Sequence, residues 1–144
     1  MQADRHKSPD LSTPWVLPGG PSGVTVAREA ARRQMTALGV TSPEVVDTAE
    51  LIVSELTSNA VKHAGGQPSL CLLRTGDVIR IEVCDANARQ VPVEREVDVD
   101  AESGRGLLLV SRLATAWGYR HQADQKCTWA EVEISALASP KLSN

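Results

Sequence analysis

The chain has 144 residues, of which 42% are hydrophobic and 23% charged, and its formal net charge is −3. This length and composition fit one domain with one apolar core. The acidic balance and the 3% content of aromatic residues exclude a typical nucleic-acid binder, which uses basic patches and stacking rings. No apolar run reaches the roughly 18 residues of a membrane span, so we expect no membrane association.

Cysteine usage and the N-terminal sequence favour an intracellular protein. Cys71, Cys84 and Cys127 lie far apart and lack the close spacing of zinc ligands. We therefore expect buried, reduced thiols and a cytoplasmic location. The polar start of the chain contains no hydrophobic signal-peptide segment, which agrees with that location.

The first half of the chain predicts one short strand and two helices. Residues 15–17 can form an edge strand before a turn rich in proline and glycine. Apolar residues recur at helical spacing over 23–38 and again over 43–64. Ser42 and Pro43 are a typical N-cap and first helical residue for the second of these helices.

A hairpin and a long loop follow. The segments 69–74 and 78–84 are rich in strand-forming residues and flank the turn sequence Thr75-Gly76-Asp77, which predicts an antiparallel hairpin. Regular signals then vanish over 86–103. A loop of this length is typical of a functional or disordered segment.

The remaining sequence predicts a third helix and a closing hairpin. The helix is expected to open at Gly104 and to extend to Trp117, and strands are expected at 119–121 and 127–134. Trp117 and Trp129 are candidates for the apolar core.

The most informative motif lies on the second helix. Glu55 and Asn59 are four residues apart, so both lie on one helix face, near the border of the apolar stripe. A carboxylate can accept a proton from a hydroxyl, and an amide oxygen suits Mg²⁺ beside a triphosphate. The pair favours nucleotide chemistry, although the same spacing is common on exposed helices.

Three further motifs follow in order along the chain. Asp85 ends an apolar strand, where its carboxylate can accept a hydrogen bond from the amine of adenine. Gly104 and Gly106 stand at the expected helix start, where unpaired N–H groups and the helix dipole favour phosphate. The last motif, residues 126–131, lies on the final strand and could flank the base. Each motif alone is ordinary, and only their arrangement is specific.

In this order, the four motifs resemble the GHKL ATPase superfamily and, within it, the small bacterial anti-sigma factor serine/threonine kinases. The resemblance covers residues 14–135, with 1–13 and 136–144 as flexible ends. It implies an α/β (α+β) two-layer sandwich, in which about three helices cover one face of a mixed, mostly antiparallel sheet. ATP and Mg²⁺ would bind between the helices and a lid formed by residues 86–103.

The same resemblance assigns roles to individual residues. Glu55 would be catalytic, Asn59 would hold Mg²⁺, and Asp85 would read the adenine. Further nucleotide contacts are implied for the other motif residues: Lys62, His63, Asn87, Gly104, Arg105, Gly106, Leu107 and Thr128. Lys62 and His63 have an alternative role as charges that favour the C-terminal end of their helix.

Two departures from the family pattern alter this assignment. The family commonly has glycines after the aspartate, whereas Asp85 is followed here by Ala-Asn-Ala-Arg, which predicts an altered nucleotide affinity. The family often has threonine where Cys127 stands, and strand alternation directs the neighbouring Thr128 to the opposite face.

The resemblance implies an ATP-dependent protein serine/threonine kinase that binds a sigma factor and is switched by an anti-anti-sigma protein of the STAS type. Relatives also suggest a homodimer. The first alternative is a non-catalytic nucleotide-binding regulator that sequesters a protein partner. The second is a detached sensor-kinase domain that phosphorylates histidine, although no dimerisation helix pair is evident. A purely structural interaction module is the third.

Overall fold

A computed structural model describes residues 14–64, 67–85, 101–122 and 125–135. The expected flexible ends, Asn87 and most of the expected lid lie outside these residues. The helices and strands, in chain order, are β1 (Trp15–Val16), α2 (Pro21–Ala37), α3 (Pro43–Ala64), β2 (Ser69–Thr75), β3 (Val78–Asp85), α5 (Ala101–Leu113), β4 (Ala116–Gln122) and β5 (Gln125–Glu133).

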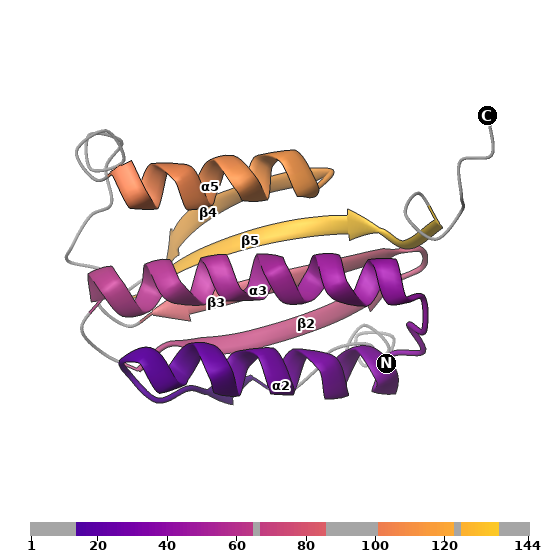
Figure 1. Ribbon diagram of the computed structural model, residues 1–144, viewed down its shortest axis with the longest axis horizontal. Coiled ribbons are helices and arrows are strands. Elements are labelled where there is room, and N and C mark those ends of the chain that lie inside the picture. Colours follow the sequence, from indigo (N-terminus) through magenta and orange to yellow (C-terminus); the bar gives the residue numbers. More distant parts are fainter. Residues whose placement is uncertain (1–13, 65–66, 86–100, 123–124, 136–144) are drawn as a thin grey trace.

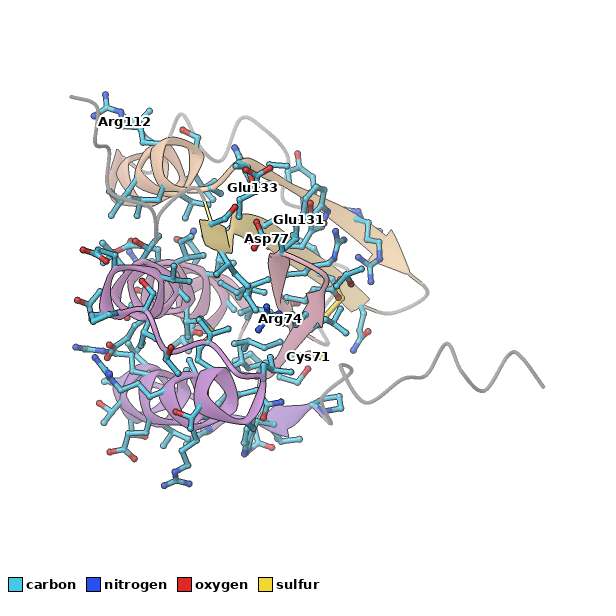
Figure 2. The ribbon with its side chains drawn as sticks, turned by 90° about the vertical axis from the view of Figure 1, so that its right-hand side faces the viewer. Cys71, Arg74, Asp77, Arg112, Glu131 and Glu133 are labelled. Atoms are coloured by element: carbon cyan, nitrogen blue, oxygen red, sulfur yellow. A yellow bond between two sulfur atoms is a disulfide. The ribbon has the colours of Figure 1, made fainter. Side chains whose placement is uncertain are left out.

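Within the described residues, the three helices form one layer and the five strands form the other (Figure 1). Turned by 90°, the molecule shows the helices on one side and the sheet on the other (Figure 2). The α/β sandwich expected from the sequence is therefore confirmed. In the helix layer, α3 lies between α2 and α5 (Figure 1).

The sheet has the strand order β1-β2-β3-β5-β4, and every pair of neighbours is antiparallel. The expected mixture of parallel and antiparallel pairs is absent from the described part of the chain. The reason is that β5 inserts between β3 and β4. These two strands run in the same direction but never pair with each other.

The core lies between the two layers. Alternate residues of β3, namely Ile79, Ile81 and Val83, are buried on the face that the helices cover. The small side chains of α2 let this helix pack closely on α3, and its arginines Arg28 and Arg32 form ion pairs with Glu50 of α3. These contacts fix α3, the helix that carries the first motif.

The third helix differs from its expected position. It begins at Ala101 and ends at Leu113, so Trp117 belongs to β4 and packs beside the core. The helix ends early because the chain turns into the sheet, where Thr115 N–H donates to Glu131 O at 2.8 Å.

Trp129 also departs from expectation. Its strand register places it opposite Glu82, on the sheet face away from the helices. There its ring lies against Gly118, at which a Cβ atom would come within 3.0 Å of it, and the Arg80 guanidinium lies 4.2 Å from the ring centroid. Trp129 is thus held by cross-strand neighbours and not by the core between the layers.

The cysteines correct another expectation. Cys84 and Cys127 face each other across β3 and β5, with Cα atoms 4.0 Å apart, and form a disulfide. Cys71, on β2, does not take part in it. The prediction of reduced thiols is wrong for the paired residues because sequence spacing does not reveal strand register.

None of the described helices is long and apolar enough to cross a membrane.

Candidate functional site

Glu55 and Gly106 bring the first and third motifs together. Glu55 lies on α3, and Gly106 is buried on the neighbouring helix α5. A Cβ atom built on Gly106 would lie 2.8 Å from Glu55 Oε1. The carboxylate therefore rests against the backbone of α5, in space that a side chain at this position would otherwise occupy.

Asn59 lies one turn further along α3, on the same helix face as Glu55. Both side chains are half-buried, so the fold holds them while part of each stays accessible. Lys62, near the end of the helix, is exposed. The side chain of His63 lies outside the described part of the structure.

Asp85 ends β3 on the face that the helices cover. It continues the buried row of Ile79, Ile81 and Val83, and only 4% of its surface is exposed. It is the one buried carboxylate in the described part of the chain. A carboxylate at this place presents acceptor oxygens at the end of the strand, which suits recognition of a polar ligand.

Thr128 lies on the same side of the sheet as Asp85. The register pairs Thr128 with Val83 and Lys126 with Asp85, and Cys127 is on the opposite face with Cys84. The predicted alternation between Cys127 and Thr128 is confirmed. Thr128 is half-buried, on a strand next to Asp85, and it faces the helix layer together with Lys126 and Ala130.

The glycine motif lies inside α5 instead of at its entry. Since the helix begins at Ala101, both glycines lie within it, and the N–H groups that lack a partner in the helix precede Gly104 in the chain. Gly106 contributes a close approach between helices. Leu107 packs against the core, and the side chain of Arg105 lies outside the described part of the structure.

The structure therefore brings Glu55 of α3 against Gly106 of α5, with Asn59 on the same face of α3 as Glu55. Asp85 and Thr128 lie on the sheet face that the helices cover. Sequence reasoning missed the direct approach of Gly106 to Glu55. Spacing within one element reports a shared face, but it carries no signal for contact between two helices far apart in the chain.

A family model described as the histidine kinase-like ATPase domain matches residues 17–132. The chain belongs to this family. The match includes α3, β3, α5 and β5, the elements that carry the four motifs. A histidine kinase-like ATPase domain implies ATP binding. No curated protein matches the chain.

Two solved structures share the fold of this histidine kinase-like ATPase domain. One is the SiaB–SiaC complex from Pseudomonas aeruginosa, with a TM-score of 0.60 and 14% identity, covering 91% of this chain and 95% of the other. The second contains the RsbU and RsbW domains of Rv1364c from Mycobacterium tuberculosis, with a TM-score of 0.60 and 17% identity. This match covers 85% of the present chain and 33% of the Mycobacterium chain. At these identities, the likeness shows the fold.

The residues present fit an adenine nucleotide. Asp85 offers a buried acceptor for an exocyclic amine, and Asn59 offers a carboxamide oxygen of the kind that Mg²⁺ prefers. Glu55 supplies a half-buried carboxylate on the same helix face as Asn59.

Proposed function

We propose that this histidine kinase-like ATPase domain is an ATP-dependent protein serine/threonine kinase that also acts as an anti-sigma factor. The observation that carries the proposal is the approach of Glu55 to Gly106, because it sets a candidate base on α3 beside the glycine motif of α5. A kinase of this type needs positioned charges more than covalent chemistry.

Each site residue has a proposed role. Bound ATP would supply the phosphoryl group, and Mg²⁺ would partly neutralise the charge of the triphosphate. Asn59 would hold the metal, and Asp85 would accept a hydrogen bond from the adenine amine. Gly104, in the first turn of α5, would let a phosphate come close to the start of this helix, and Glu55 would orient or deprotonate the acceptor hydroxyl. Further nucleotide contacts are proposed for the other motif residues: Lys62, His63, Asn87, Arg105, Gly106, Leu107 and Thr128.

The proposed partners are a sigma factor and an anti-anti-sigma protein of the STAS type. They follow from the resemblance of the four motifs to anti-sigma kinases. Two structural neighbours support a protein partner, since one is in complex with SiaC and the other contains an RsbU and an RsbW domain. A homodimer belongs to the same proposal, because the family resemblance suggests one. A cytoplasmic location belongs to it because sigma factors act on RNA polymerase in the cytoplasm.

Two variants of α3 test the mechanism. Glu55→Ala should keep most ATP affinity and lower phosphoryl transfer by about 10²-fold or more, the scale of a positioned general base. Asn59→Ala should instead lose Mg²⁺-dependent binding, because a metal ligand acts already in the ground state. Calorimetry measures binding, and γ-labelled ATP with candidate anti-anti-sigma proteins measures transfer.

Glu50→Ala is the matched control, because Glu50 lies on the same helix but forms ion pairs with α2. This variant should leave transfer per folded molecule unchanged. Full transfer by Glu55→Ala would overturn the proposed mechanism, and absence of ATP binding by the wild type would overturn the function itself.

The second candidate function is a non-catalytic nucleotide-binding regulator that sequesters a protein partner. It is favoured by Asn87 and Arg89, which stand where the family commonly has the two glycines that follow the aspartate. Wild-type protein that binds ATP and a partner, yet transfers no phosphate to any candidate, would establish this function instead.

A further inference from the structure

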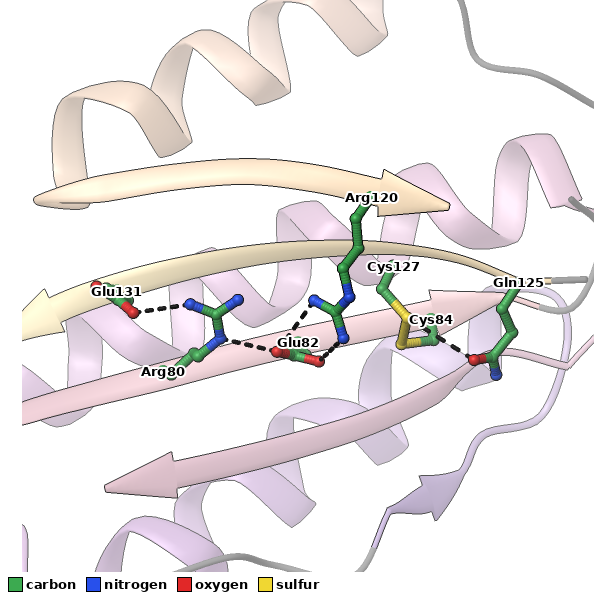
Figure 3. Close-up of polar contacts among 7 residues, drawn as sticks. All are labelled: Arg80, Glu82, Cys84, Arg120, Gln125, Cys127 and Glu131. Carbon is green, nitrogen blue, oxygen red and sulfur yellow. Dashed lines mark hydrogen bonds and ion pairs between the residues drawn. A yellow bond between two sulfur atoms is a disulfide. The ribbon is translucent and has the colours of Figure 1, made fainter. Parts of the chain in front are cut away.

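The disulfide between Cys84 and Cys127 lies directly behind the candidate site. The two cysteines face away from the helices and join β3 to β5 near the end of their ladder (Figure 3). The next residue of each strand points to the opposite face. Cys84 is followed by Asp85 and Cys127 by Thr128, the two site residues on the sheet.

We propose that the Cys84–Cys127 pair is a redox-controlled clamp that sets the nucleotide affinity of this site. The proposal rests on the proposed function, because it needs a nucleotide to bind at Asp85. The oxidised pair holds Asp85 and Thr128 at one spacing. Reduction removes the bond and lets the two strand ends separate.

The direction of the coupling follows from the geometry. Beyond the cysteines, one register pair, Asp85 with Lys126, completes the ladder between β3 and β5. Strand ends fray easily, so a covalent bond one residue earlier lowers the freedom of this last pair. A site that is already ordered pays less entropy when it binds a ligand. The oxidised protein is therefore the tighter nucleotide binder.

The bond is open to exchange on one side. Cys84 is half-buried, whereas Cys127 is only 1% exposed. A thiolate of a small dithiol reductant attacks Cys84 Sγ, the Sγ–Sγ bond breaks, and Cys127 leaves as a thiolate that then takes up a proton. The second thiol of the reductant releases Cys84 and is itself oxidised to a disulfide, so two electrons pass to the protein.

A metal site is the weaker interpretation of the same cluster. Ligand atoms of Glu82, Cys84 and Cys127 lie within 4.8 Å of one another. However, the two sulfur atoms are bonded to each other, and Glu82 already forms ion pairs with Arg80 and Arg120 (Figure 3). Two guanidinium groups beside the carboxylate disfavour a cation. In the reducing compartment proposed above, disulfides are usually transient and redox-sensing, which favours the clamp.

The test compares ADP binding with Mg²⁺ in oxidised and reduced wild-type protein by calorimetry. Oxidised protein should bind about fivefold or more tightly than reduced protein, the lower end of ordinary coupling between two sites. By reciprocity, saturating ADP should shift the thiol–disulfide equilibrium by the same factor in a dithiothreitol redox buffer. Alkylation and mass spectrometry measure that equilibrium without any assay of turnover.

Two variants separate the clamp from general redox effects. Cys84→Ser combined with Cys127→Ser should bind ADP like the reduced wild type and should not respond to reductant. Cys71→Ser, on the neighbouring strand β2, should keep the full response. Equal affinity of both redox forms of the wild type would overturn the clamp and leave the proposed function intact. Absence of ADP binding in both forms would overturn the proposed function and the clamp with it.

Discussion

The carboxylate oxygen Oε1 of Glu55 lies 2.8 Å from the position that a Cβ atom on Gly106 would occupy. A Cβ carbon and an oxygen that are neither bonded nor hydrogen-bonded do not stay so close, so any side chain at Gly106 must displace Glu55. The displaced group is the end of a flexible side chain and not a backbone atom. The fold can therefore accept an alanine at Gly106, but the Glu55 carboxylate must then move from its present position.

Gly106→Ala should separate stability from activity. Alanine inside α5 favours the helix by about 0.5–1 kcal/mol over glycine, so the melting temperature should hold or rise. Phosphoryl transfer should fall by about tenfold or more, because a misplacement of about 1 Å can cost as much as 10²-fold in rate. Thermal denaturation and γ-phosphate transfer measure the two quantities.

A double variant tests whether the loss acts through Glu55. If it does, Gly106→Ala should add little to the loss already caused by Glu55→Ala, since the carboxylate that it displaces is gone. Losses that multiply independently would show that Gly106 acts on the reaction by another route.

Asp85→Asn should weaken ATP binding by roughly tenfold or more, because a buried hydrogen bond to a charged group is worth about 1.5–3 kcal/mol. The amide can present a donor where the carboxylate only accepts. Asp77→Asn is the matched control, since Asp77 lies in the turn at the other end of β3, where it accepts hydrogen bonds from Ser135. Calorimetry that finds equal dissociation constants for Asp85→Asn and wild type would remove Asp85 from the site.

Features that depend on residues close together in the chain could be predicted from the sequence. Ser42 caps α3 as expected, with Val45 N–H donating to its hydroxyl at 3.4 Å. Gly76 adopts a φ of 61° in the hairpin turn between β2 and β3, a conformation that glycine reaches without strain. Strand alternation correctly separated the faces of Cys127 and Thr128.

Features that depend on contact between distant segments could not be predicted. The disulfide follows from the register that sets Cys84 opposite Cys127, and Trp129 is placed by Gly118 and Arg80 on neighbouring strands. For α5, the glycines suggested a helix start, but the helix already begins at Ala101. The roles of the site residues toward ATP remain predictions.

Thr57 is a buried polar residue that no motif requires. Its side chain is 0% exposed, and its hydroxyl has no hydrogen-bond partner among the residues that the structure describes. Thr57→Val keeps the shape and removes the hydroxyl, so it should stabilise the fold by about 1 kcal/mol, the lower range of the cost of burying an unpaired hydroxyl. Chemical denaturation should show a higher midpoint, and a lower midpoint would indicate a partner for the hydroxyl.

Glu82 joins two arginines on the sheet face away from the helices (Figure 3). Its carboxylate lies 2.7 Å from Arg80 Nε and 3.2 Å from Arg120 Nη2, and Arg80 also pairs with Glu131 at 2.8 Å. Burial by itself raises the pKa of Glu82. The hydrogen bonds from Arg80 and Arg120 outweigh burial and hold the pKa below its ordinary value of 4.5.

This lowered pKa predicts how stability depends on pH. The folded protein binds the Glu82 proton less readily than the unfolded chain, so the ion pairs contribute fully above the ordinary pKa of 4.5, and the contribution is lost as pH falls through the folded pKa. Glu82→Gln should therefore be less stable than wild type near pH 7, by about 1 kcal/mol after solvent screening. The difference should shrink steadily below about pH 4.5. Urea denaturation at pH 7, 5, 4 and 3 measures it, with Glu133→Gln as the control for net charge, and a difference that stays constant down to pH 3 would contradict the role of the ion pairs.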